Sequence, residues 1–218
     1  MRTTVALLLV TCLMVMAGSA QASIVGVGGP LSALGAAPAI IAAPPDANED
    51  AAYNLGMEGF DERQRVVLTS NIATDQGVIA AGTFVSSHMI FLNTGPGNNT
   101  QANSHFGVNW TFDGIILGVM SNYDGSMEMA STPQLGAIGT LYPSVPFNAR
   151  GLESNVGPEG PNDGYSFAGN TLSIGVGMYV TEPGDWIRVV TSAVPEPGTI
   201  TLLGLGLIGL AVLARKRA

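Results

Sequence analysis

Two segments of the chain, 104–112 and 172–180, alternate between apolar and polar side chains. A period of two residues places successive side chains on opposite faces, so each segment is predicted to be a β-strand with one buried face. The residues expected to point into the core are Phe106, Val108, Trp110 and Phe112 in the first segment and Leu172, Ile174, Val176, Met178 and Val180 in the second.

Shorter apolar runs predict further strands, because Gly, Asn, Asp and Pro separate them as turn residues do. These runs are 65–69, 78–85, 89–92, 115–120 and 186–191. Between the two ends of the chain, only 126–135 favours a helix, of one or two turns. About seven short strands with Gly-rich turns predict a mainly β fold, an antiparallel β-sandwich or jelly roll.

The first 22 residues have the order of a secretory signal peptide. One positive charge at Arg2 precedes an apolar run over 5–17, and the small residues Ala20 and Ala22 follow. We expect signal peptidase to cut after Ala22. A first membrane helix is the alternative, but the run is shorter than the ~20 residues of a usual span. The only cysteine, Cys12, lies in this run, so the mature chain would have no thiol for a disulfide or a nucleophile.

The C-terminus has three parts in a fixed order. The motif Val194, Pro195, Glu196, Pro197 precedes an apolar segment over 198–214, and the cations Arg215, Lys216 and Arg217 follow, with Ala218 last. As a helix, the apolar segment is about 25 Å long, slightly shorter than a ~30 Å hydrocarbon core. It is predicted to be a membrane helix with its basic end in the cytoplasm and the body outside.

The two prolines of the motif fix the backbone and bar the residues before them from a helix. Val194–Pro197 is therefore expected to be an extended peptide just above the bilayer, as a processing enzyme requires. Residues 194–217 resemble the PEP-CTERM sorting signal of Gram-negative bacteria. The resemblance implies recognition and cleavage near the motif by exosortase, and association with exopolysaccharide production. An ordinary membrane anchor behind a Pro-rich stalk is the alternative.

These signals divide the chain into four predicted parts: a signal peptide at 1–22, a Gly/Ala/Pro-rich acidic linker at 23–54, a β-sandwich ectodomain at 55–193 and a sorting signal at 194–218. Residues 23–193 contain four arginines, no lysine and fifteen acids, a net charge of −11. Such a surface repels nucleic acid and anionic membranes. It suits neutral sugars or divalent cations, and solubility alone would explain it equally well.

The two histidines, His88 and His105, are the first candidates for chemistry. With Asp61, Glu62 or Asp113 they would form a metal site or a Ser-His-Asp arrangement. His105 is expected on the polar face of its strand, and His88 on a face with apolar residues. The sequence has neither a nucleophile elbow nor spaced metal ligands. A structural role is therefore favoured, and we predict no catalytic residue and no metal ligand.

Acidic residues offer a second possibility. Asp61 and Glu62, together with Asp113 or Glu128, are candidates for the paired carboxylates of a glycosidase. Adjacent acids at the start of a strand are more often solvated turn residues. No cofactor is predicted, although an irregular structural calcium site among the acids stays an alternative.

The two tryptophans are predicted to differ. Trp110 shares its face with apolar residues and is expected in the core, whereas Trp186 follows a turn and is the better candidate for an exposed platform for a sugar ring. The sequence thus predicts an exported surface or matrix protein, non-catalytic, adhesive or associated with exopolysaccharide. Before processing, the membrane holds it through 198–214. A secreted carbohydrate-active hydrolase with the same tail is the alternative.

Overall fold

The computed structural model describes residues 23–48, 51–93, 102–152, 163–181 and 184–194, together with Gly206. The chain divides into two units, and the one described below is Ala22–Ala193. The other comprises Met1–Gln21 and Val194–Ala218. The predicted signal peptide, and the predicted membrane helix apart from Gly206, therefore lie outside the described residues. Within the described ranges, no helix is both long and apolar enough to cross a membrane.

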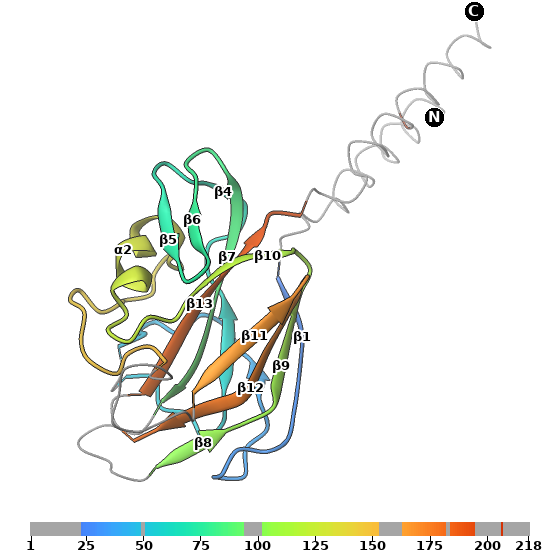
Figure 1. Ribbon diagram of the computed structural model, residues 1–218, viewed down its shortest axis with the longest axis vertical. Helices are drawn as coiled ribbons and strands as arrows, with labels where there is room; N and C mark the ends of the chain where they lie inside the picture. The colour runs from blue at the N-terminus through green and yellow to red at the C-terminus, as the bar shows by residue number, and fades with distance from the viewer. Residues whose placement is uncertain are drawn as a thin grey trace, which may run out of the picture. The chain divides into compact units, whose positions relative to one another are not determined.

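The regular elements of this unit are mainly β-strands with one helix (Figure 1). In chain order they are β1 (Ile24–Gly28), β2 (Ala39–Ile40), β3 (Glu58–Asp61), β4 (Val66–Val67), β5 (Ile72–Thr74), β6 (Gly77–Ile79), β7 (Phe84–Asn93), β8 (Asn103–His105), β9 (Val108–Phe112), β10 (Ile116–Met120), α2 (Ser126–Leu135), β11 (Gly164–Ala168), β12 (Thr171–Val180) and β13 (Gly184–Ser192).

The strands form two larger sheets and one hairpin. The first sheet has the order β1-β9-β12-β11, with β8 also paired to β12. The second has the order β10-β13-β7-β3-β2, with β4 paired to β7, and β5 pairs with β6. All pairs are antiparallel except β2 with β3. The prediction of a mainly β fold with antiparallel sheets packed together is confirmed. The finer assignment to a sandwich or jelly roll stays a prediction.

The main core lies between the two sheets, because each supplies one apolar face. From the first sheet, β9 contributes Trp110 and β12 contributes Leu172 and Ile174; from the second, β7 contributes Ile90 and β13 contributes Ile187. These five side chains are fully buried. Full burial of one such side chain stabilises the fold by about 1.5–3 kcal/mol. The predicted core position of Trp110 is confirmed.

The outer face of the second sheet is also covered. Helix α2 and hairpin β5–β6 lie on the side of β13 that is opposite the first sheet (Figure 1). They contribute Leu135 and Ile72 to a second apolar cluster with Val190 of β13. Strand β13 is therefore buried along almost its whole length, as is β7. A strand that is covered on both faces lacks the alternation of apolar and polar residues that marks a strand with one exposed face.

The prediction of a linker over 23–54 is wrong for much of that segment. Strand β1 pairs with β9 from Ile24 to Gly28, and β2 pairs with β3 in the other sheet. Ile24, Ala47 and Asn54 are buried. The segment also passes close to the chain before β9, because a Cβ on Gly29 would lie 3.0 Å from the Gly107 carbonyl oxygen.

The two strictly alternating segments are interrupted at matching places. Segment 104–112 divides into β8 and β9 around Gly107, where φ is +69°. Opposite it, β12 bends at Gly177, where φ is +110°. A Cβ on Gly177 would lie 2.0 Å from the Phe106 ring, so the ring occupies the space that glycine leaves. Phe106 and Val176 are consequently 43% and 52% exposed, and their predicted core positions are wrong.

Candidate functional site

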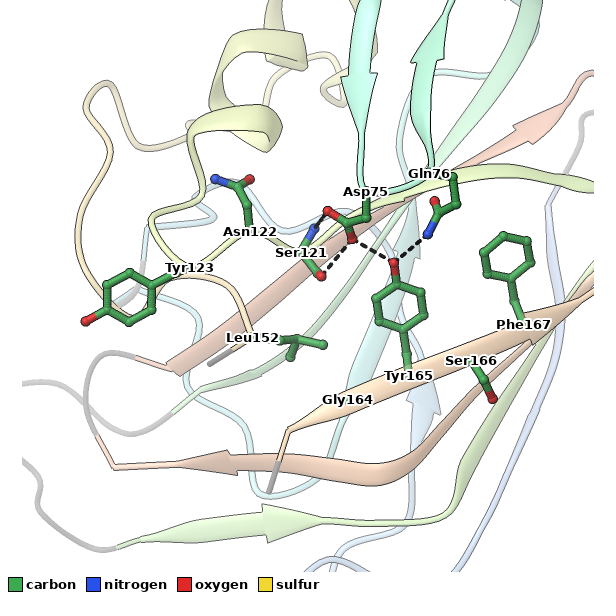
Figure 2. A pocket seen from close by; sticks show the side chains of 10 residues that line it. All are labelled: Asp75, Gln76, Ser121, Asn122, Tyr123, Leu152, Gly164, Tyr165, Ser166 and Phe167. Atoms are coloured by element: carbon green, nitrogen blue, oxygen red, sulfur yellow. Dashed lines mark hydrogen bonds between the residues drawn. The ribbon is translucent and has the colours of Figure 1, made fainter. Parts of the chain in front are cut away.

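A groove of about 650 Å³ opens between β11 and the tip of hairpin β5–β6 (Figure 2). Four stretches of chain supply its walls: the hairpin turn, the segment after β10, Leu152 and strand β11. The lining residues are Asp75, Gln76, Ser121, Asn122, Tyr123, Leu152, Gly164, Tyr165, Ser166 and Phe167. We call this site the Asp75–Tyr165 groove.

The hairpin turn is hydrogen-bonded to the backbone of β10. Asp75 N donates to the Val119 carbonyl at 2.8 Å, and Val119 N donates to Gln76 Oε1 at 2.8 Å. The approach requires glycine at position 118, because a Cβ there would lie 2.6 Å from Thr74 Oγ1. Asp75 and Gln76 are thus placed by packing of the hairpin as well as by the turn itself.

The Tyr165 hydroxyl links the two sides of the groove. It donates to Asp75 Oδ2 at 2.7 Å and accepts from Gln76 Nε2 at 2.8 Å. Ser121 Oγ donates to the same carboxylate oxygen at 2.8 Å. Burial, and then the hydrogen bond to Asp75, raise the pKa of Tyr165. The phenol is protonated at neutral pH, and its hydrogen bond holds the carboxylate in place.

An aromatic pair forms the wall on β11. Tyr165 and Phe167 are two residues apart and project from the same side of the strand, whereas Ser166 projects from the other (Figure 2). Their rings are nearly parallel, with an interplanar angle of 11° and centroids 6.5 Å apart. The groove thus has apolar ring faces next to fixed oxygen and nitrogen atoms.

The opposite wall is formed by the segment that leads into α2. Asn122 Nδ2 donates to Ser126 Oγ at 2.9 Å, and Asn122 Oδ1 accepts from Met127 N at 3.1 Å. These bonds tie the amide to the first turn of the helix. Asn122 therefore occupies one orientation, and a ligand would meet a pre-arranged wall.

The described lining of the groove combines aromatic rings with fixed polar groups. Asp75 is the only carboxylate among the ten lining residues. General acid–base cleavage of a glycosidic bond uses two carboxyl groups about 5–9.5 Å apart. Rings beside a few fixed polar groups are what a small-molecule or sugar site requires.

Trp186 does not belong to this or any other exposed surface, so its predicted exposure is wrong. Its side chain is 1% exposed. The ring stacks on Phe91 with centroids 4.1 Å apart, and the Arg150 guanidinium carbon lies 4.3 Å from the centroid of the Trp186 ring. Because the ring is buried, it offers no face for a sugar.

The structure joins His88 to Asp61, one of its suggested partners. His88 Nδ1 lies 2.7 Å from Asp61 Oδ1, and His88 Nε2 lies 3.1 Å from Thr191 Oγ1. The order acid, imidazole, hydroxyl resembles that of a hydrolase. However, His88 and Thr191 are fully buried, and the His88 ring packs against Phe112. A substrate has no access to this hydroxyl, and the arrangement joins the neighbouring strands β3, β7 and β13 of the second sheet.

His105 is buried rather than on a polar face. Met57 N donates to its Nδ1 at 2.9 Å, so Nε2 carries the proton and donates to the Pro30 carbonyl at 2.9 Å. Burial lowers the pKa of His105, against a smaller opposing effect of the Pro30 bond. The neutral ring fastens the N-terminal segment to β8.

The suggested carboxylates Glu62 and Glu128 are each paired with a buried arginine instead of with another acid. Arg188 contacts Glu62 through Nε and Nη2, both at 2.7 Å. Arg150 contacts Glu128 through Nε and Nη2, both at 3.1 Å. Glu62 is therefore buried and not a solvated turn residue. Within the described ranges, no three His, Cys, Asp or Glu residues come together as a metal site.

Sequence reasoning missed the groove and the buried arginines. Asp75 and Tyr165 are 90 residues apart, and no local pattern connects them. One signal was present for Arg188: it stands within the apolar run Trp186–Val190, in a body with only four arginines. A lone cation inside a strand pattern indicates a buried partner.

The sorting residues fall almost wholly outside the described ranges. Of the motif 194–197, only Val194 is described, and Arg215, Lys216, Arg217, Ala20 and Ala22 are not. Their roles stay predictions from the sequence. In comparison with known proteins, residues 193–217 match the model of the PEP-CTERM protein-sorting motif. The chain matches no curated protein and no solved structure.

Proposed function

Because this chain is an exported protein with a PEP-CTERM sorting motif, we propose that its body binds exopolysaccharide through the Asp75–Tyr165 groove without cleaving it. The motif implies processing by exosortase and delivery to the cell surface. A protein placed there meets secreted glycans at high local concentration. Binding needs no further cofactor, and the mature chain would act as an adhesive or matrix component.

The single observation that carries the proposal is the Tyr165 hydroxyl fixed between Asp75 and Gln76 beside the Phe167 ring. A sugar ring has apolar C–H faces and a rim of hydroxyls. Aromatic rings accept the faces, and the carboxylate and amide groups exchange hydrogen bonds with the rim. Because these groups are already fixed by one another, binding costs little side-chain entropy.

The charge of the body narrows the class of glycan. Residues 23–193 carry a net charge of −11, and the groove itself contains Asp75. Like charges repel at a binding surface. We therefore expect neutral polysaccharides to be preferred over those rich in carboxylate or sulfate groups.

Binding is tested with the full chain in detergent on an array of neutral and acidic oligosaccharides. Phe167→Ala removes one ring and is expected to weaken binding at least tenfold. Phe84→Ala is the matched control, since Phe84 is 58% exposed outside the groove. Equal binding by both variants, or release of reducing ends from a bound glycan, would contradict the proposal.

Tyr165→Phe provides a second test. It keeps the ring and removes the hydroxyl that joins Asp75 to Gln76. Loss of affinity here, with the ring retained, would support a role for the fixed polar groups. Unchanged affinity for every glycan would restrict the interaction to stacking and remove the polar network from the proposal.

A further inference from the structure

The first two backbone nitrogens of the predicted mature chain each donate a hydrogen bond to a carboxylate. Ser23 N donates to Asp113 Oδ1 at 2.8 Å, and Asp113 N donates back to the Ser23 carbonyl at 3.1 Å. Ile24 N donates to Asp61 Oδ1 at 2.9 Å. Asp113 follows β9 of the first sheet and Asp61 ends β3 of the second, so the start of β1 is held by both sheets.

The position of Ser23 is fixed by its neighbour. Ile24 pairs with Phe112 in β9, and its side chain is buried in the core between the sheets. Asp61 is itself held by His88 at 2.7 Å. Ser23 N therefore lies at a set distance from Asp113, one residue after the predicted exit of the signal peptide at Ala22.

We infer that Asp113 is the binding site for the α-ammonium group of the processed chain, which cleavage between Ala22 and Ser23 creates. Hydrolysis adds water across this peptide bond: the signal peptide leaves with a new carboxyl group, and Ser23 keeps the amine. The acid releases a proton and the amine takes one up, because an α-amino group titrates at about 7.7–8.0.

Cleavage thus turns a neutral amide donor into a cation at the same carboxylate. A hydrogen bond between two charged groups is shorter and stronger than one with a neutral donor. Asp61 and His88 are the other titratable groups at this end of β1, and the Ile24 amide already engages Asp61. A chain cut at another bond would place its ammonium group away from Asp113 and lose the pair.

The test compares two detergent-purified chains that both end at Ala218, one beginning at Ser23 and one at Gln21. Each is prepared with and without Asp113→Asn, and melting temperatures are measured. Because Asp113 is exposed, the pair is screened by solvent, and we expect Asp113→Asn to lower the melting temperature about 1–3 °C more in the Ser23 chain. The extra loss should vanish in 1 M salt.

Equal losses in the two chains would overturn the inference, whatever the size of the loss. Terminal sequencing of the mature chain from an exporting cell gives the second decision: Ser23 at the first position supports the site, and any other first residue overturns it. Glycan binding by the Asp75–Tyr165 groove involves neither Ser23 nor Asp113, so it is measured on the same samples and separates this inference from the proposed function.

Discussion

Arg188 and Glu62 form a bidentate ion pair, with both nitrogen–oxygen distances at 2.7 Å and both side chains fully buried. The segments that pack on the outer face of the second sheet bury this pair. Tyr142 OH donates to Glu62 Oε1 at 2.7 Å, and Ser87 Oγ donates to Glu62 Oε2 at 2.6 Å. Burial opposes the charge on Arg188, but Glu62 outweighs it and raises the pKa of the guanidinium.

Removing one member of this pair should be far more harmful than removing both. Glu62→Ala leaves the Arg188 charge buried without its carboxylate, and we expect a loss of about 3–5 kcal/mol in the free energy of unfolding. The double variant Glu62→Ala with Arg188→Met removes both charges and should recover part of that loss. Urea denaturation at pH 7 measures each value. A double variant that loses the sum of the two single losses would contradict the prediction.

Glycine at position 118 should be required for the groove. Gly118→Ala places a methyl group against Thr74, so the hairpin must move away from β10 and carry Asp75 and Gln76 with it. We expect weaker glycan binding and a destabilisation of about 1–3 kcal/mol. Gly175→Ala is the control, because a Cβ there meets its nearest neighbour only at 3.9 Å. The same affinity for both variants would show that the hairpin position does not matter.

Alkaline pH should destabilise the fold through Tyr142. Burial, followed by the charge of Glu62 and the hydrogen bond to it, raise the pKa of the Tyr142 phenol. The unfolded chain therefore loses this proton near pH 10 while the folded chain keeps it. The resulting stability is present below that pH and falls above it, by at most about 1.4 kcal/mol for each pH unit.

Urea denaturation between pH 9 and 11 measures this slope. Tyr142→Phe is expected to flatten it, because the variant has no phenol proton to lose. Between pH 7 and 8 neither the native chain nor the variant should show a slope from this group, which serves as the internal control. A slope above pH 10 that is identical in the two proteins would assign the effect to other groups.

Processing should depend on the two prolines of the motif. Pro195→Ala with Pro197→Ala lets the segment before 198–214 continue as a helix, which removes the extended peptide that a processing enzyme requires. We expect a precursor of unchanged mass to accumulate in the membrane. Mass spectrometry and cell fractionation measure this, with Pro143→Ala in the body as the control. Normal release of the variant would indicate that the prolines are dispensable.

Local patterns predicted much of the secondary structure, because strand and helix periods depend on neighbours in the sequence. Strand β12 covers the predicted 172–180, and α2 coincides with 126–135. The two side chains misplaced in the alternating segments each stand next to a glycine. Phe106 and Val176 were assigned by extending a period across Gly107 and Gly177, where φ is positive. The buried positions shift by one residue at Gly107, whereas at Gly177 only Val176 leaves the buried face and Met178 stays on it.

Trp186 was misplaced for a different reason. Whether a strand is covered on one face or two depends on segments far away in the sequence, here the one that carries Ala47 and the one that carries Arg150. The same holds for the groove, where a turn residue and a strand residue 90 positions apart share one hydrogen bond. The residue pattern of one segment carries no information about its contact with the other.

The sequence by itself determined where this protein goes, because a sorting motif is a short linear peptide that is recognised by the order of its contiguous residues. Tertiary structure decided which side chains are available once it arrives. Burial of Trp186, pairing of Glu62 with Arg188, and the meeting of Asp75 with Tyr165 all arise from long-range packing. Such contacts form only when the two sheets pack together and distant segments pack on the outer face of the second sheet.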